Sequence, residues 1–293
     1  FTPLLAGILI LLYAKELLQI KKIYLVSAVV VGLLFISPML QYLVSNEQAL
    51  TRARETSIFA DKTNIANNAI RLDADTKSGD FVGLLFDNRR VFYLTKIVDG
   101  YIAHFSLNWL FITGDNNPRH HAPNMSLLYL FELPFLLLGI YAFLFLKLDR
   151  KVKLLVFLWF LAAPVPASIT SGVPHAVRTI NFLPLFQLFT AAGMLGVYQF
   201  LQKYKGVSIK YKAIRLSLYT LFFILATFNF AYYSNQYFVQ MNYVTAKDWQ
   251  YGYAEAVPYI NSISHNYQKI IVTNKEPLDQ SYIFFLYYLK FPP

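Results

Sequence analysis

Cysteine is absent from the 293-residue sequence. This absence excludes disulfide-stapled domains, cysteine-ligated metal sites and thiol nucleophiles. Charged residues are also scarce, at 14% of the chain against about 25% in soluble domains, whereas hydrophobic residues make up 56%. Such a composition is typical of a membrane protein. The chain opens on Phe1 without the charged region of a signal peptide, and we expect sequence to be missing from both ends.

Several apolar runs are long enough to cross a bilayer, which takes about 20 helical residues. We predict six spans, the first of them short or truncated, at residues 1–18, 24–44, 126–146, 154–171, 182–201 and 216–235. The expected fold is therefore mainly α, with a polytopic transmembrane helix bundle over residues 1–235.

Basic residues gather in three short connections between these spans. The connections hold 12 of the 26 basic residues and two of the 16 acidic ones, and so carry the whole formal charge of +10. The basic residues are Lys15, Lys21, Lys22, Lys147, Arg150, Lys151, Lys153, Lys203, Lys205, Lys210, Lys212 and Arg215. The positive-inside rule makes this side cytoplasmic. We therefore predict a multi-pass protein of the plasma (inner) membrane, with anionic lipids rather than nucleic acid beside the basic connections.

A long outer segment over residues 45–125 separates the second and third predicted spans. Its aromatic runs at 81–86 and 92–111 are interrupted by charged residues. This pattern predicts helices lying in the membrane interface. A surface loop with a few buried aromatic residues is the alternative.

The last part of the chain, residues 236–293, changes character. Its pattern predicts a helix over 247–264, bent or broken at Pro258, and a short buried strand over 269–273. A further helix over 282–290 follows, with Asp279 as its N-cap. Helix, strand and helix in this order predict the start of an extracytoplasmic α/β module.

Ionisable side chains are nearly missing from the predicted spans, where Glu132 is the only acidic residue apart from Glu16 near the end of the first run. Transporters place charged groups or broken helices near the bilayer midplane. The pattern therefore argues against a transport path through the spans and favours a functional site at the outer face.

Two clusters of arginine and histidine lie at the outer ends of spans. Arg119 and His120 fall in the turn over residues 114–123, and His175 precedes Arg178 by three positions. A guanidinium offers paired donors to phosphate, and an imidazole adds a donor or a proton. Each cluster could instead only contact lipid phosphates or cap carbonyls. Two such clusters on one face favour a site for a lipid phosphate.

A metal site is not predicted. His120 and His121 are adjacent, so their imidazoles rarely meet at one ion, and no cysteine supplies a further ligand. No cofactor is assigned, and the need for a divalent metal is left open.

Four motifs carry a resemblance to a known family: GDNNPRHHAP from Gly114, ELPFLLLGIY from Glu132, APVPAS from Ala163 and PHAVRTINFLPLFQLFTAAG from Pro174. Over roughly residues 45–235 the chain resembles the C-terminal half of bacterial glycosyltransferases of the GT-C superfamily, in the group of protein mannosyltransferases and the lipid A aminoarabinose transferase. The resemblance implies a polyprenyl-phosphate-linked sugar donor, reaction at the outer face and inversion of the anomeric centre. It also implies a catalytic carboxylate in an N-terminal outer loop that this chain does not contain.

We therefore expect an integral membrane glycosyltransferase whose acceptor is a glycan, a lipid or a protein. Arg178 and Arg119 would bind the donor phosphate, with His175 and His120 as secondary donors, and Glu132 would orient one of them. A lipid-linked oligosaccharide flippase or another transporter is the alternative. A non-catalytic membrane protein with an outer sensor domain is a third interpretation.

Overall fold

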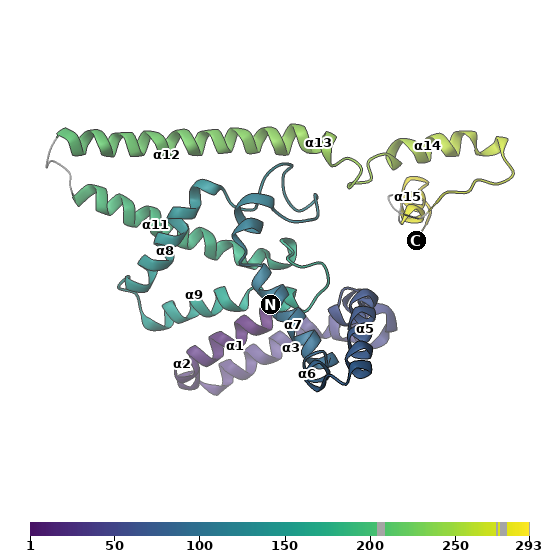
Figure 1. The fold of residues 1–293 in the computed structure, drawn as a ribbon, viewed down its shortest axis with the longest axis horizontal. Coiled ribbons are helices and arrows are strands. Elements are labelled where there is room, and N and C mark those ends of the chain that lie inside the picture. The colour runs from purple at the N-terminus through teal and green to yellow at the C-terminus, as the bar shows by residue number, and fades with distance from the viewer. Residues whose placement is uncertain (204–208, 274, 276–279, 293) are drawn as a thin grey trace. The chain divides into compact units, whose positions relative to one another are not determined.

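Figure 1 shows the fold as a computed structural model, which describes residues 1–203, 209–273, 275 and 280–292. The described residues are mainly helical and contain no β-strand. A single antiparallel bridge joins Ser57 and Thr170. The expectation of a mainly α fold is confirmed.

The α-helices are α1 (Thr2–Leu12), α2 (Ala14–Gln19), α3 (Lys22–Ser45), α4 (Thr51–Glu55), α5 (Lys62–Ser78), α6 (Phe81–Phe86), α7 (Arg89–Ala103), α8 (Leu133–Phe145), α9 (Arg150–Ala162), α10 (Val165–Ser168), α11 (Leu183–Lys203), α12 (Ile209–Asn235), α13 (Met241–Val244), α14 (Tyr253–Ile263) and α15 (Ser281–Tyr288). Short 3-10 or π turns complete the chain: η1 (Glu47–Leu50), η2 (Ile58–Ala60), η3 (Trp109–Thr113), η4 (Leu130–Glu132), η5 (Val177–Phe182), η6 (Gln236–Gln240) and η7 (Ser264–Asn266).

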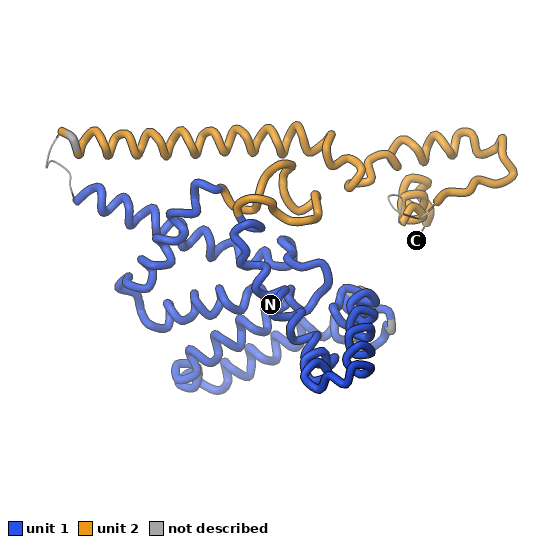
Figure 2. The backbone as a smooth tube through the Cα atoms, in the orientation of Figure 1, with its two compact units in different colours: residues 1–110, 130–207 blue, residues 111–129, 208–293 orange. Residues whose placement is uncertain are grey.

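The chain forms two compact units, which Figure 2 distinguishes by colour. Unit 1 comprises Phe1–Leu110 and Leu130–Val207, and unit 2 comprises Phe111–Tyr129 and Ser208–Pro293. The two clusters singled out in the sequence therefore belong to different units. The turn that carries His175 and Arg178 lies in unit 1, and the loop that carries Arg119 and His120 lies in unit 2.

Four stretches within the described residues are long and apolar enough to cross a membrane. They are Lys22–Ser45, Arg150–Ser168, Val177–Lys203 and Tyr211–Val244. The prediction of six spans is not supported, because two of the apolar runs fold into shorter helices. Thr2–Leu12 and Leu130–Phe145 reach about 16 and 24 Å at 1.5 Å per residue, short of a hydrocarbon core of about 30 Å.

Among the described residues, helices α8 and α11 make the most extensive helix contact of unit 1, and Figure 1 shows them crossing. Gly139 of α8 and Gly193 of α11 meet backbone to backbone at the crossing. A Cβ atom added to Gly139 would lie 2.9 Å from the nitrogen of Gly193, and one added to Gly193 would lie 2.9 Å from that of Gly139. Only glycine allows two helices to approach so closely.

Phenylalanine rings fill the space around this crossing. Phe189 of α11 is fully buried, and its ring lies 5.5 Å from that of Phe143 in α8 and 5.4 Å from that of Phe160 in α9. The Phe160 ring lies 4.8 Å from Phe182 at the end of η5. These edge-on and tilted contacts hold α8, α9 and α11 together as the core of unit 1.

Two of the basic connections meet at one end of unit 1. Glu16 of α2 forms an ion pair with Lys151 of α9, and the hydrogen bond from Lys151 lowers the pKa of Glu16. The Lys151 ammonium also lies 5.0 Å from the ring centroid of Tyr13. Lys153 donates to the carbonyl of Leu144 at 2.7 Å and so helps to satisfy the C-terminal end of α8.

The segment that follows α3 folds into the short helices α4 to α7, and three of them have side-chain caps. Asp61 accepts hydrogen bonds from two backbone N–H groups at the start of α5, and Gly79 ends α5 with φ of +69°. Helix α6 exposes most of its apolar side chains, including Phe81 at 78% and Phe86 at 63%. The runs predicted at 81–86 and 92–111 are therefore largely helical, and their placement in the membrane interface stays a prediction.

A pair of carboxyl groups joins α5 to the end of α6. Asp75 packs against Gly83, where an added Cβ would lie 2.6 Å from the carboxyl carbon of Asp75. Burial raises the pKa of Asp75, and the neighbouring Asp87 raises it further. Arg71 approaches Asp87 at 3.6 Å. Both causes disfavour the charged form of Asp75.

The C-terminal residues of unit 2 form a small helical hairpin. The Tyr253 ring of α14 stacks on Phe284 of α15 with 4.6 Å between centroids, and Val257 is fully buried. Helix α14 begins six residues later than the predicted helix over 247–264, and it continues through Pro258 without ending there.

The predicted α/β module is not supported. Residues 269–273, predicted to be a buried strand, have no β-partner within the described residues. Ile271 in this stretch is 81% exposed. A single extended segment cannot satisfy its own backbone, so it forms a strand only beside another one. Asp279, predicted to be an N-cap, lies outside the described residues, and the following helix begins at Ser281.

Candidate functional site

The candidate site of unit 1 is the turn between α10 and α11. Helix α9 starts at Arg150 beside the basic connections, and α11 ends at Lys203. The turn over residues 169–182 therefore joins the helix ends that lie farthest along the chain from those basic groups. Gly172 takes φ of +68° within it, a left-handed conformation that suits glycine.

Arg178 is held firmly by this turn. Its Nη1 donates hydrogen bonds to the Thr170 hydroxyl and to the Ser171 carbonyl, each at 2.6 Å. Its backbone N–H donates to Nδ1 of His175 at 3.3 Å. The side chain is half-buried. The sequence singles out Arg178 by its residue type and does not show these partners within the protein.

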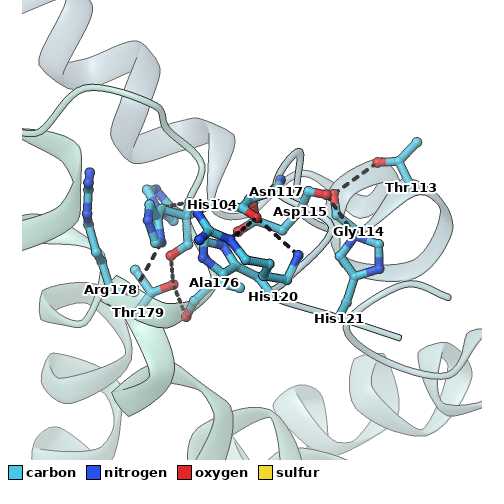
Figure 3. A network of polar contacts seen from close by, with 12 residues as sticks. His104, Thr113, Gly114, Asp115, Asn117, His120, His121, Ala176, Arg178 and Thr179 are labelled. Atoms are coloured by element: carbon cyan, nitrogen blue, oxygen red, sulfur yellow. Dashed lines mark hydrogen bonds and ion pairs between the residues drawn. The ribbon is translucent and has the colours of Figure 1, made fainter. Parts of the chain in front are cut away.

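His175 takes its orientation from the same contacts. Because its Nδ1 accepts from Arg178 N–H, the neutral ring carries its proton on Nε2. The Thr179 hydroxyl donates to the His175 carbonyl at 2.9 Å, and Figure 3 shows Arg178 and Thr179 side by side on this turn. An arginine and an imidazole N–H donor therefore come from one short turn.

Residues 56–58 form backbone hydrogen bonds with this turn. Ser171 donates its backbone N–H to the Thr56 carbonyl at 2.8 Å, and Ile58 N–H donates to the Ile169 carbonyl at 3.2 Å. These two bonds flank the bridge between Ser57 and Thr170. The acceptor of the Arg178 guanidinium is thus fixed by a segment more than 100 residues earlier.

His104 is a residue of this site that the motifs of the sequence do not single out. It is fully buried at the C-terminal end of α7. Its Nδ1 lies 2.7 Å from the Gly100 carbonyl, and its Nε2 accepts the backbone N–H of His175 at 3.2 Å. One signal in the sequence could have found it, because Tyr93, Ile97 and His104 share the buried face of α7.

The candidate loop of unit 2 is built around Asp115. The buried Asp115 carboxylate lies 3.1 Å from Nδ1 of His120 and accepts the Asn117 N–H at 2.8 Å. His121 bridges the carbonyls of Asp115 and Ala122 with its two ring nitrogens.

Arg119 stays at the surface of this loop. Its backbone N–H and its Nε both approach the side-chain oxygen of Asn117, at 3.0 and 3.3 Å. Figure 3 shows Asp115, Asn117 and His120 gathered within the loop. Asp115 and His120 could each give one ligand to an ion.

Glu132 lies in η4, directly before α8. Its Oε2 is buried and has no hydrogen-bond partner within the described part of the chain. The role predicted for Glu132, to orient an arginine or a histidine of the site, stays a prediction.

Comparison with protein-family models, characterised proteins and solved structures finds no match. The GT-C resemblance therefore stays an interpretation of the motifs.

Proposed function

We propose that the chain is part of an integral membrane glycosyltransferase that transfers a sugar from a polyprenyl-phosphate donor at the outer face of the membrane. The observation that carries the proposal is the Arg178 guanidinium, fixed by Thr170 and Ser171 at the end of a candidate span. His175 contributes a second donor from the same turn.

The chemistry requires a cation beside the donor phosphate. As the bond from the sugar to the phosphate oxygen breaks, the leaving lipid phosphate gains negative charge. A cation held in place before the reaction stabilises that charge without reorganising. Arg178 fits this requirement because its own protein already fixes the plane of its guanidinium. Arg119 and His120, in unit 2, are proposed as additional groups for the donor or the acceptor.

The remaining parts of the reaction lie outside these residues. The resemblance implies that an aspartate in an N-terminal loop removes the proton of the acceptor hydroxyl, which then attacks the anomeric carbon. Sugar and acceptor identity are not assigned, and no metal is assigned. The outer-face location follows from the charge distribution of the sequence, and it belongs to the proposal.

Arg178 variants of the full-length enzyme test this role. Lysine is a compact charge and cannot reproduce the fork that reaches two acceptors. We expect Arg178→Ala to lower kcat by about 10²–10³-fold, the usual effect of removing a donor to a developing anion, and Arg178→Lys to lose a large part of the same activity.

The control separates catalysis from folding. Arg90 is exposed at the start of α7, and its side chain makes no hydrogen bond within the described residues, so Arg90→Ala should leave kcat unchanged. Thr170→Val keeps the Arg178 charge but removes one acceptor, and should cost less activity than Arg178→Ala. Turnover of Arg178→Lys close to wild type would show that Arg178 only supports the turn.

A further inference from the structure

His104 has a defined protonation state in this fold. Its Nδ1 lies 2.7 Å from the Gly100 carbonyl, which can only accept, so the proton is on Nδ1. Its Nε2 faces the backbone N–H of His175 at 3.2 Å, which can only donate. The ring is therefore a neutral imidazole that donates at one nitrogen and accepts at the other.

The packing around His104 leaves the ring one orientation. The side chain has no exposed surface, and its ring meets Trp109 edge to face with 5.5 Å between centroids. One turn earlier, Gly100 touches the turn itself: an added Cβ would lie 3.0 Å from Val173 Cγ2 and 3.3 Å from the Ser168 carbonyl. The end of α7 is thus pressed against the segment that leads into Pro174.

A relay of hydrogen bonds continues from His104 to Arg178. The Nε2 atom of His104 accepts a hydrogen bond from the backbone N–H of His175. His175 in turn accepts the backbone N–H of Arg178 on its Nδ1 at 3.3 Å. The position of the His175 main chain therefore determines where both the His175 imidazole and the Arg178 backbone lie. Figure 3 shows His104 beside this turn.

We propose that His104 is the positioning residue of the turn that carries His175 and Arg178, and that it acts through an Nε2 that must remain an acceptor. The identity of the ligand that this turn would bind, a lipid-linked phosphate, rests on the proposed function. The contact between His104 and His175 does not depend on that function.

Two amide substitutions test the roles of the two His104 ring nitrogens separately. In His104→Gln the side-chain oxygen can reach the position of Nε2 and accept from His175. In His104→Asn the shorter side chain keeps a donor near Nδ1 but cannot reach His175. A role in positioning predicts rescue by glutamine alone. His265→Gln, at an exposed position in η7, is the control for the substitution itself.

The first readout needs no enzymatic activity. In the full-length protein with ¹⁵N-labelled histidine, NMR should show one neutral ring protonated on Nδ1, and its signal should be missing in His104→Gln and His104→Asn. Backbone hydrogen exchange at His175 should be about tenfold faster or more in His104→Asn, the usual effect of leaving a buried N–H without its acceptor, and near wild type in His104→Gln. A His104 protonated on Nε2, or equal exchange in both variants, would overturn the inference.

The second readout is kinetic. With a polyprenyl-phosphate sugar as the probe, His104→Asn should raise KM and lower kcat about tenfold, whereas His104→Gln should stay within a few-fold of wild type. Equal losses in both variants would mean that His104 is a packing residue only. If the wild-type protein transfers no sugar, the proposed function fails, and the NMR and exchange results still decide the role of His104.

Discussion

Replacing Gly193 by alanine should separate the two helices that form the core of unit 1. An added Cβ there would lie 2.8 Å from the carbonyl carbon of Phe135 and 2.9 Å from the nitrogen of Gly139, and it would overlap the carbonyl oxygen of Phe135. All three atoms belong to the backbone of α8. No side-chain rotation can relieve the overlap, so the helices must move apart.

The size of the effect follows from these distances. Non-bonded carbon atoms rest about 3.5–4.0 Å apart, so the backbone of α8 has to shift by roughly an ångström or more. That shift also loosens the contact between Phe143 and Phe189 across the same interface. Overpacking of this kind costs about 1–3 kcal/mol, and we expect the upper end because backbone meets backbone. At about 2–4 °C per kcal/mol for a chain of this size, Tm should fall by roughly 6–12 °C.

Thermal stability in detergent measures the loss. Protein remaining monodisperse after heating can be followed by size-exclusion chromatography of the wild type and Gly193→Ala. Gly196→Ala is the matched control, because Gly196 lies on the same helix and an added Cβ there meets nothing within 4 Å. Alanine is the better helix former, so this control should keep or slightly raise Tm. Equal Tm values for the two variants would refute the close crossing of α8 and α11.

Two further predictions concern the orientation of the chain in the membrane and the carboxyl group of Asp75. Because the chain has no cysteine, single cysteines report topology directly: one at Asp149 should be shielded from an impermeant thiol reagent in intact cells, whereas one at His265 should react, and labelling at Asp149 would reverse the proposed orientation. Burial and Asp87 raise the pKa of Asp75, so ionising Asp75 destabilises the fold as pH rises through its folded pKa. Asp75→Asn should therefore raise Tm at pH 7.5 and lose this effect below the ordinary aspartate range near about pH 3.9, whereas the control Asp73→Asn, at an exposed position paired with Lys77, should not raise Tm at pH 7.5.

Hydropathy predicted the membrane-spanning stretches better than it predicted their ends. The runs at 24–44 and 182–201 fall within Lys22–Ser45 and Val177–Lys203. The run at 1–18 failed because Tyr13 interrupts it with φ of −112°, which divides it into α1 and α2. The run at 126–146 failed because its first residues belong to the preceding loop. The mean hydropathy of a run does not predict the backbone angles at which a helix ends.

The candidate site was predictable in its residues but not in its contacts. His175 and Arg178 were identifiable because their residue types suit phosphate and they stand three positions apart. The groups that hold them come from elsewhere in the chain, since Thr56 and His104 precede Ser171 and His175 by 115 and 71 positions. Periodicity describes one element at a time, and it cannot show which distant element will supply an acceptor.

The hydrogen bonds of Arg178 bear on whether this residue only anchors a helix end or also stabilises a leaving group. A guanidinium that only anchored a helix end to bulk lipid would gain little from Thr170 and Ser171, because a freely moving side chain finds lipid phosphates equally well. A cation that must stabilise a leaving group gains from being fixed, because a fixed charge does not lose freedom or reorganise during the reaction. Two bonds of 2.6 Å to one nitrogen give that fixation. The same bonds that support the turn therefore favour the interpretation of Arg178 as part of a reaction site.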